Sequence, residues 1–391
     1  MNKIKIMVGV AGSGAMGSGI AQLAATKGHQ VILVDNNHSA LEKSEEYINK
    51  ALYNLVVKQK INDDDAAKFK NLISFSDNIS DFKSCGIVIE AIVEKLDIKQ
   101  ELFKQLENIV AMDCLLATNT SSLSVTAIAG ACVNPSRVIG IHFFNPAPVM
   151  PLVEIIPGLT TDEKVIINAR SLINGWGKTT VVAKDTPGFI VNRIARPFYG
   201  EAIRIYEEQL TNFLTIDNAM KEVGGFKMGP FELMDFIGND INYAVTETVW
   251  QQMFFDPRYK PSLTQKRLVE AGRLGRKSGR GYYTYSGNNL ESNLPDDKKY
   301  YQYIVNRILC MLVNEAIDAL YHGIATKEDI DLAMTKGVNY PKGLLVWADD
   351  MGLSIVLKTI NQLYDEYSED RYRPSPLLKK MVANNLKFYN L

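Results

Sequence analysis

The sequence predicts an N-terminal α/β domain followed by two tandem all-α domains. Three observations lead to this fold class. A glycine-rich turn lies between a short apolar run and a helical segment near the start, further apolar runs alternate with helical segments up to about residue 150, and one helical module occurs twice in the second half. The expected boundaries are 1–185 for the α/β domain, 186–285 and 300–391 for the two helical copies, and 286–299 for a linker.

Composition excludes several classes of protein. The chain has 391 residues, of which 46% are apolar and 22% charged, as in soluble globular proteins of two or three domains. A net charge of −1 gives no electrostatic case for binding nucleic acid or an anionic membrane. The four cysteines are scattered without C-x-x-C spacing, which favours reduced thiols and no metal site. No secretory leader or membrane-length apolar run is evident, so a cytoplasmic protein is expected.

The first element is an apolar run, residues 4–11, of the kind found in strands buried on both faces. GSGAMG follows it and gives a G-x-G-x-x-G pattern. A helical segment then runs to Gly28, and the next apolar run, VILVD, ends in Asp35. The pattern therefore stands between a strand and a helix, with an acid about 20 residues further on, which is the context that a dinucleotide site requires. The loop residues are Gly12, Gly14, Ala15, Met16 and Gly17.

Each residue of this pattern has a physical role in binding a dinucleotide. Gly12 permits the tight turn, Gly14 lets a pyrophosphate approach the backbone, and Gly17 lets helix and strand pack closely. The N–H groups at the helix start attract phosphates. Asp35 would bind ribose hydroxyls and repel a 2′-phosphate, which favours NAD over NADP. The competing interpretation is an ordinary turn with a solvated aspartate.

Three further apolar runs are predicted as buried strands, and a helical segment at 94–111 separates the first two. Alternation of strand and helix indicates a parallel, doubly wound sheet that binds ligands at the carboxyl ends of its strands. A long helical pair between Ser39 and about Lys70 exceeds what a plain crossover needs. The strands are 86–92, 114–119 and 137–143, and the polar residues at their ends are Glu90, Glu94, the NTSS of 119–122, and His142.

His142 and Glu154 are candidates for proton transfer. His142 ends a predicted strand, and a loop stiffened by three prolines brings Glu154 back toward it. Oxidation of a secondary alcohol by NAD leaves a hydroxyl proton, and histidine, with an ordinary pKa of about 6.5, accepts it well at neutral pH. A carboxylate on the other ring nitrogen would fix the tautomer. A core histidine with its hydrogen bonds satisfied is the alternative for His142 considered alone.

A helical module begins at Asn192 and again at Asn306. The segments NRIARPFYGEAIRIYEEQLTNFLTIDNAM and NRILCMLVNEAIDALYHGIATKEDIDLAM align without a gap. Because an isologous interface joins identical patches, a duplicated module can form such an interface inside one chain. We therefore expect the second copy to pack on the first as a second subunit would, which leaves further homo-oligomerisation open. The alternative is a degenerate appendage with its own partner.

The order and spacing of the motifs resemble the L-3-hydroxyacyl-CoA dehydrogenases. The match covers residues 3–285 through GSGAMGSGIAQ, EAIVEKLDIKQELF, TNTSSLS, HFFNPAPVMPLVEI, DTPGFIVNRI, GPFELMDFIG and GRKSGRGYY. The resemblance implies a Rossmann-type N-terminal domain, NAD as cofactor and acyl-CoA as substrate. It places the family's catalytic residues at Ser121, His142, Glu154 and Asn192.

The resemblance also implies the binding residues. The cofactor contacts fall on the loop 12–17 and on Asp35, Glu94, Lys99 and Lys277. The helical hairpin after Asp35 is where the family holds CoA. A lysine of the family aligns there with Lys58, although a solvated helix lysine is the alternative, and a serine of some members is replaced by Ala51.

The implied reaction is NAD-dependent oxidation of (S)-3-hydroxyacyl-CoA to 3-oxoacyl-CoA, or its reverse, as in fatty-acid or phenylacetate degradation. One alternative is a dehydrogenase for a small hydroxy acid without CoA, and another is a non-catalytic NAD-binding protein. The second helical copy departs from the usual chain of the family. Tandem modules of this kind occur in multifunctional β-oxidation enzymes and in bacterial dehydrogenases of the phenylacetate pathway. Asn306 lacks the TPGF lead-in of Asn192 and is expected to be structural.

Overall fold

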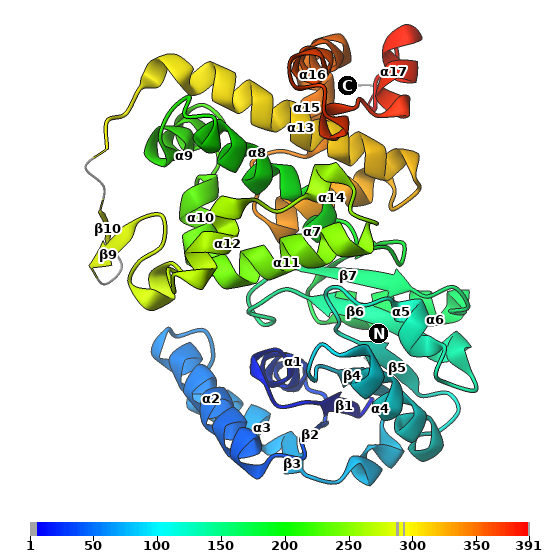
Figure 1. Ribbon diagram of the computed structural model, residues 1–391. Coiled ribbons are helices and arrows are strands. Elements are labelled where there is room, and N and C mark those ends of the chain that lie inside the picture. Colours follow the sequence, from blue (N-terminus) through cyan, green and yellow to red (C-terminus); the bar gives the residue numbers. More distant parts are fainter. Residues whose placement is uncertain (1–5, 287–288, 292–293, 390–391) are drawn as a thin grey trace. The chain divides into compact units, whose positions relative to one another are not determined.

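The computed structural model describes residues 6–286, 289–291 and 294–389 (Figure 1). The chain divides into two units, Met1–Thr186 and Pro187–Leu391. The first holds the sheet and the second is helical, so the predicted fold class is confirmed.

The first unit is built on an eight-stranded sheet in the order β3-β2-β1-β4-β5-β6-β7-β8. Strands β1 to β6 are parallel, as predicted. Strand β7, however, pairs antiparallel with β6, and β8 pairs parallel with β7. The strands are β1 Val8–Ala11, β2 Val31–Val34, β3 Ile73–Ser76, β4 Ile87–Glu90, β5 Leu115–Thr118, β6 Val138–Phe143, β7 Leu152–Pro157 and β8 Thr179–Val182.

Helices cover both faces of this sheet (Figure 1). One apolar cluster joins the sheet to α1, α2 and α6, and a second joins its other face to α4 and α5. Burial of both faces explains why the strands consist almost entirely of apolar residues. The helices are α1 Ala15–Thr26, α2 His38–Val57, α3 Asp63–Asn71, α4 Leu96–Ile109, α5 Val125–Ala129 and α6 Glu163–Gly175, with the 3-10 turns η1 Ile79–Ser84 and η2 Pro135–Arg137.

The second unit contains the duplicated module. The first copy comprises α7 Val191–Ile194, α8 Arg196–Glu207, α9 Phe213–Glu222, α10 Pro230–Ile237, α11 Asn239–Gln252 and α12 Leu263–Glu270, with η3 Pro257–Tyr259 and η4 Arg276–Ser278. The second comprises α13 Tyr301–Tyr321, α14 Lys327–Gly337, α15 Leu344–Met351, α16 Leu353–Tyr367 and α17 Pro376–Ala383, with η5 Lys298–Tyr300 and η6 Asp370–Tyr372.

The predicted linker, 286–299, is not wholly irregular. Strand β9 (Thr284–Ser286) pairs antiparallel with β10 (Asn289–Glu291), and η5 begins at Lys298. Residues 287, 288, 292 and 293 of the linker lie outside the described residues.

The repeat is visible in individual hydrogen bonds. Asp217 in α9 accepts the N–H groups of Phe231 and Glu232 at the start of α10, at 2.9 and 2.8 Å. Asp331, at the corresponding position of α14, accepts the first N–H groups of α15 in the same way. Each carboxylate satisfies donors that a helix start leaves unpaired, so both copies fix the same inter-helix turn by the same device.

The two copies exchange buried ion pairs. Arg193 of the first copy bonds Glu315 of the second at 2.8 Å. Arg307, which corresponds to Arg193, bonds Glu201, which corresponds to Glu315, at 2.6 Å. The pairing is therefore reciprocal, as across a two-fold axis.

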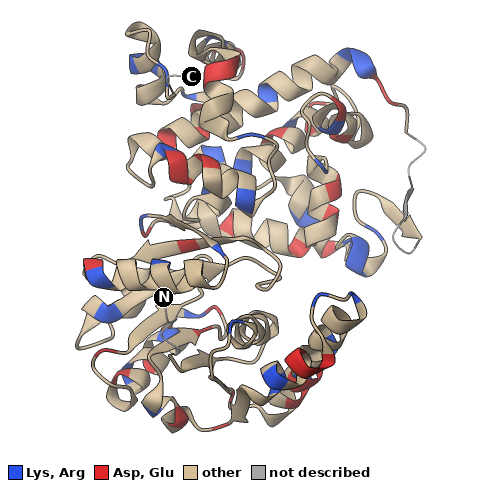
Figure 2. Cartoon of the chain, turned by 180° about the vertical axis from the view of Figure 1, so that it is seen from behind, with Lys and Arg blue, Asp and Glu red and all other residues tan. Residues whose placement is uncertain are grey.

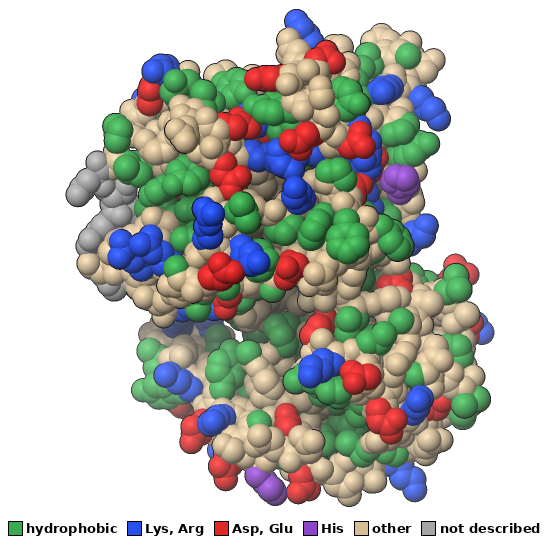
Figure 3. All heavy atoms as spheres, viewed as in Figure 1, with side chains coloured by type: hydrophobic (Ala, Val, Ile, Leu, Met, Phe, Trp, Pro, Cys, Tyr) green, Lys and Arg blue, Asp and Glu red, His purple; other side chains and the backbone are tan. Residues whose placement is uncertain are grey.

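Charges are mixed rather than gathered by sign. Figure 2 shows basic and acidic segments interspersed over each unit, and the face in Figure 3 mixes charged and hydrophobic side chains in the same way. Across the part of the chain that the structure describes, every helix is too short or too polar to span a membrane.

Candidate functional site

The glycine turn connects β1 to α1 as predicted. Gly12 has a φ of +102°, which a side chain would strain. A Cβ on Gly17 would lie 1.8 Å from the carbonyl oxygen of Gly12, so only glycine lets α1 start this close to the strand. A Cβ on Gly14 would meet nothing within 4 Å. That space and the start of α1, where Ala15 is exposed and Met16 is partly buried, fit a bound pyrophosphate.

Asp35 faces this turn. The backbone N–H and the hydroxyl of Ser13 both donate to Asp35 Oδ2 at 2.8 Å. The carboxylate is thereby fixed beside the glycine loop, where the ribose of a dinucleotide is bound in this class of site. Sequence reasoning did not single out Ser13. The only available signal was its place inside the glycine pattern.

Lys99, a predicted cofactor contact, is held by two carboxylates. Its side chain is 1% exposed, and its ammonium lies 2.5 Å from Glu90 Oε1 and 3.1 Å from Glu94 Oε2. Thr118 also donates to the buried Glu90, at 2.7 Å. These bonds join the ends of β4 and β5 to α4, so the observed contacts of Lys99 are structural.

Glu94 organises the loop that carries Ser121. Its Oε1 accepts the Thr120 hydroxyl at 2.5 Å and the Ser121 N–H at 3.0 Å. Burial alone would raise the pKa of Glu94, but Lys99 and these hydrogen bonds outweigh burial and hold the pKa below its ordinary value. An ionised Glu94 thus anchors the backbone of Ser121.

His142 and Glu154 lie directly opposite each other on neighbouring strands. In the antiparallel register of β6 and β7, His142 pairs with Glu154, and the distance from Nδ1 to Glu154 Oε2 is 2.7 Å. His142 is 5% exposed and Glu154 is fully buried. The expectation that a loop carries Glu154 was wrong. Pro151 precedes β7, where no ladder N–H is needed, so the three prolines between His142 and Glu154 all lie outside the strand.

The other candidates lie apart from this group in the chain. Asn192 belongs to α7 in the second unit, and its carbonyl accepts from Arg196 Nε at 2.8 Å. Lys277 also belongs to the second unit, where its ammonium pairs with Asp240 Oδ1 at 2.6 Å. Lys58 is exposed at the end of α2 in the first unit.

Comparison with known protein families gives two matches that together span most of the chain. Residues 7–186 match the 3-hydroxyacyl-CoA dehydrogenase NAD binding domain. Residues 188–285 and 303–387 each match the C-terminal domain of the same family, so the repeat consists of two copies of one known domain.

Individual relatives agree. The 3-hydroxyadipyl-CoA dehydrogenase of Escherichia coli is 37% identical, over 95% of this chain and 96% of that protein. The human mitochondrial hydroxyacyl-coenzyme A dehydrogenase is 42% identical, over 71% of this chain and 90% of that protein. A crystal structure of 3-hydroxybutyryl-CoA dehydrogenase from Escherichia coli superposes with a TM-score of 0.91 at 36% identity, covering 97% of this chain and 98% of that one.

The cofactor is NAD, which the glycine turn and Asp35 fit. The chain belongs to the 3-hydroxyacyl-CoA dehydrogenase family of NAD-dependent oxidoreductases.

Proposed function

We propose that this enzyme interconverts (S)-3-hydroxyacyl-CoA and 3-oxoacyl-CoA, with His142 as the proton acceptor and Glu154 as the group that orients it. The observation that carries the proposal is the buried contact of 2.7 Å between His142 Nδ1 and Glu154. NAD supplies the hydride acceptor. Glu154 favours the tautomer with a proton on Nδ1, so Nε2 is the atom that takes the hydroxyl proton, and the carboxylate stabilises the imidazolium that results.

Ser121 and Asn192 are proposed to donate hydrogen bonds to the substrate oxygen as it becomes a carbonyl. The Ser121 N–H is anchored by Glu94, and the Asn192 carbonyl is anchored by Arg196. Donors held in place before the reaction cost no reorganisation when charge shifts at the oxygen. We propose Gly12, Gly14, Ala15, Met16, Gly17, Asp35, Glu94 and Lys277 as the groups around NAD, with Lys99 acting through Glu94, and Lys58 as a contact for CoA.

The physiological substrate is proposed to be a 3-hydroxyacyl-CoA of fatty-acid or phenylacetate degradation, used in the cytoplasm. The relative that spans nearly the whole chain carries the name 3-hydroxyadipyl-CoA dehydrogenase, which supports a dicarboxylic acyl chain in the second pathway. A small hydroxy acid without CoA is the alternative. Exposure of Lys58 on the hairpin favours the CoA ester, since an ammonium there is available to phosphate.

One assay tests these proposals. Turnover is measured for 3-hydroxybutyryl-CoA, 3-hydroxyadipyl-CoA and free 3-hydroxybutyrate, each with NAD and with NADP. We expect activity on the CoA esters with NAD. His142→Ala should lower kcat by about 10²–10⁴ and leave NAD affinity within twofold. Equal loss of NAD affinity, or activity on the free acid alone, would contradict the assigned roles.

We also propose that the copies at 186–285 and 300–391 are two domains, joined by 286–299, which form a pseudo-dimer. Support comes from the two family matches in this region and from the reciprocal pairs of Arg193 with Glu315 and Arg307 with Glu201. The second copy would then occupy a surface that an unduplicated chain offers to another subunit. Deletion of residues 290–391 and substitution of Arg193 or Arg307 test this proposal.

A further inference from the structure

The loop at residues 144–151 joins the strand of His142 to the strand of Glu154. Inside it, the carbonyl of Pro146 accepts the N–H groups of Val149 and Met150, both at 3.0 Å. The loop is thus a compact turn between the ends of β6 and β7. Since it connects the two strands that carry the proposed pair, a shift of the turn would change the alignment of imidazole and carboxylate.

A buried lysine holds this turn from one side. Lys178 immediately precedes β8, and its ammonium donates to the carbonyls of Ala147 and Met150 at 2.6 and 2.7 Å. Its side chain is buried, with 8% of the residue exposed. The ammonium nitrogen carries three N–H donors, so it can bond both carbonyls at once. An apolar side chain cannot do this.

Helix α1 packs against the same turn. A Cβ built on Gly19 would lie 3.2 Å from Pro148 Cδ and 3.4 Å from Ala147 Cβ, so α1 contacts the loop closely. The loop is therefore fixed by the helix that follows the glycine turn and by the ammonium of Lys178.

We propose that Lys178 is a positioning residue for the proton transfer: by holding the turn at 146–150 it keeps the ring of His142 aligned with Glu154. The proposal rests on the proposed roles of His142 and Glu154. The proposal includes no contact of Lys178 with NAD or with the acyl-CoA substrate.

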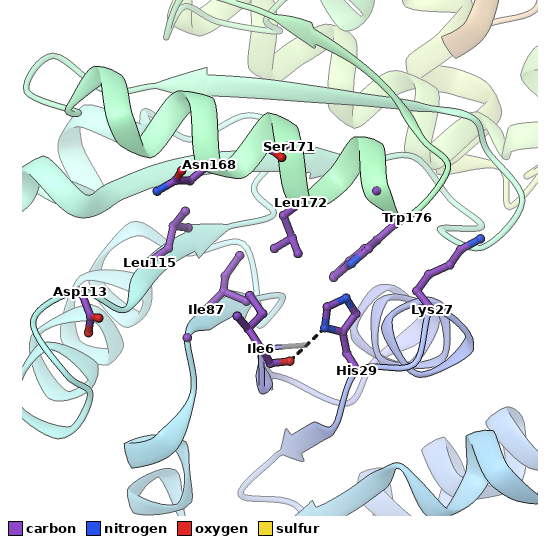
Figure 4. Close-up of a pocket in the computed structure, with 12 residues that line it drawn as sticks. Ile6, Lys27, His29, Ile87, Asp113, Leu115, Asn168, Ser171, Leu172 and Trp176 are labelled. Atoms are coloured by element: carbon purple, nitrogen blue, oxygen red, sulfur yellow. Dashed lines mark hydrogen bonds between the residues drawn. The ribbon is translucent and has the colours of Figure 1, made fainter. Parts of the chain in front are cut away.

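Lys27 provides a matched control. Its ammonium lies beside the residue that precedes Lys178, since a Cβ built on Gly177 would be 3.5 Å from Lys27 Nζ. Burial, and then repulsion from Lys27, lowers the pKa of Lys178 to about 8. Lys27 lines a cavity of about 510 Å³ with His29 and Trp176, and Figure 4 shows its side chain directed away from His29. Among the described residues Lys27 has no hydrogen bond to the loop. A cation is thus available close to Lys178 that lacks its two carbonyl contacts.

The first experiment compares Lys178→Met with Lys27→Met. Methionine reproduces the apolar stem of lysine up to Cε but lacks the ammonium group and donates no hydrogen bond. Because small misplacements of catalytic groups reduce rates strongly, we expect kcat of Lys178→Met to fall 10- to 100-fold while KM for NAD stays within twofold. Lys27→Met should keep both values within twofold. A Lys178→Met enzyme with unchanged kcat would overturn the proposal.

Two further measurements separate positioning from general stability. Added n-propylammonium should restore at least a tenth of the lost kcat of Lys178→Ala, with sodium chloride at equal ionic strength as control. In the His142→Ala background, Lys178→Met should cause no additional loss of kcat, since both residues act on the same proton transfer. Loss of NAD affinity in step with kcat, or a full additive loss in the double variant, would overturn the proposal. If His142→Ala kept its turnover, the proposed function would be overturned as well. If His142→Ala were inactive but Lys178→Met kept a normal kcat, only the role of Lys178 would be overturned.

Discussion

The two helical copies share their architecture but differ at the positions assigned to chemistry. Asp217 and Asp331 each bind the start of the following helix, and Arg193 and Arg307 each bind a glutamate of the other copy. At the position of Asn192, by contrast, the second copy has Asn306, which is exposed and bonded to Gln302 on its own helix.

The neighbour of Asn192 differs too. Arg196, which holds the Asn192 carbonyl, corresponds to the buried Cys310, whose thiol has a pKa raised by burial to about 11. An inert thiol cannot replace a guanidinium donor. The duplication therefore acts as an internal control. The residues that stabilise each copy and pair the two copies occur in both, whereas the pair of Asn192 and Arg196 occurs in the first copy and not in the second.

The largest effect should come from deleting residues 290–391. Arg193 would lose both of its carboxylate partners, Glu315 and Asp318, and the buried surface of α8 would lose α13. Because an unpaired buried charge and an exposed apolar face are both costly, we expect dimers or aggregates, seen by sedimentation velocity. A well-behaved monomer would refute the pseudo-dimer.

Single ion pairs sharpen the same comparison. Arg307→Met and Arg193→Met each break a buried ion pair between the copies, and each should lower the free energy of unfolding by about 3–5 kcal/mol. Denaturant unfolding followed by circular dichroism measures this loss. Lys298→Met, at an exposed ion pair with Glu222, serves as control and should leave the midpoint unchanged. If only one of the two arginines mattered, the interface would not be reciprocal.

Local pattern was enough to predict much of the N-terminal unit from sequence. The glycine spacing and the acid after the second strand identified the turn and Asp35, because both depend on short-range geometry. The strand of Glu154 was missed because prolines at 146, 148 and 151 indicate a loop. The pairing of β7 with β6 and β8 shows that the strand begins directly after Pro151, and this pairing cannot be seen in the local sequence.

Long-range pairing was not predictable in the same way. The resemblance placed Lys99 at the cofactor, and that role stays a prediction. Nothing local shows that Glu90 and Glu94 converge on its ammonium. The repeat was found, but its cross-pairs join residues more than 100 positions apart. One signal was available: an arginine and a glutamate eight residues apart, 193 with 201 and 307 with 315, recur on the matching helices.

Activity should respond to one copy only. Asn192→Ala should reduce kcat by about 100-fold, as expected for loss of one donor to an oxyanion. Asn306→Ala changes the same residue type in the second copy and should leave kcat within twofold. Steady-state kinetics with 3-hydroxybutyryl-CoA compares them. A comparable loss in Asn306→Ala would mean that the second copy contributes to catalysis.

The smallest effect tests how far the two halves of the interface are equivalent. The Tyr259 hydroxyl donates to Glu315 at 2.5 Å, and the Tyr372 hydroxyl donates to Glu201 at 2.8 Å. Their surroundings differ, since Arg258 reaches across to Asp318 at 2.7 Å and to Glu315 at 3.5 Å.

Arg371, the counterpart of Arg258, bonds only Glu369 among the described residues and thus stays within its own copy. Glu315 therefore keeps two arginines when Tyr259 is changed. When Tyr372 is changed, Arg307 is the one arginine left to Glu201 within the described part of the chain. We expect Tyr372→Phe to cost about 2 kcal/mol and Tyr259→Phe about 1 kcal/mol in denaturant unfolding, because a charged acceptor loses more when fewer partners remain. Equal losses would show that Arg258 adds nothing to the pairing, and the reverse order would show that Glu201 is the better satisfied of the two carboxylates.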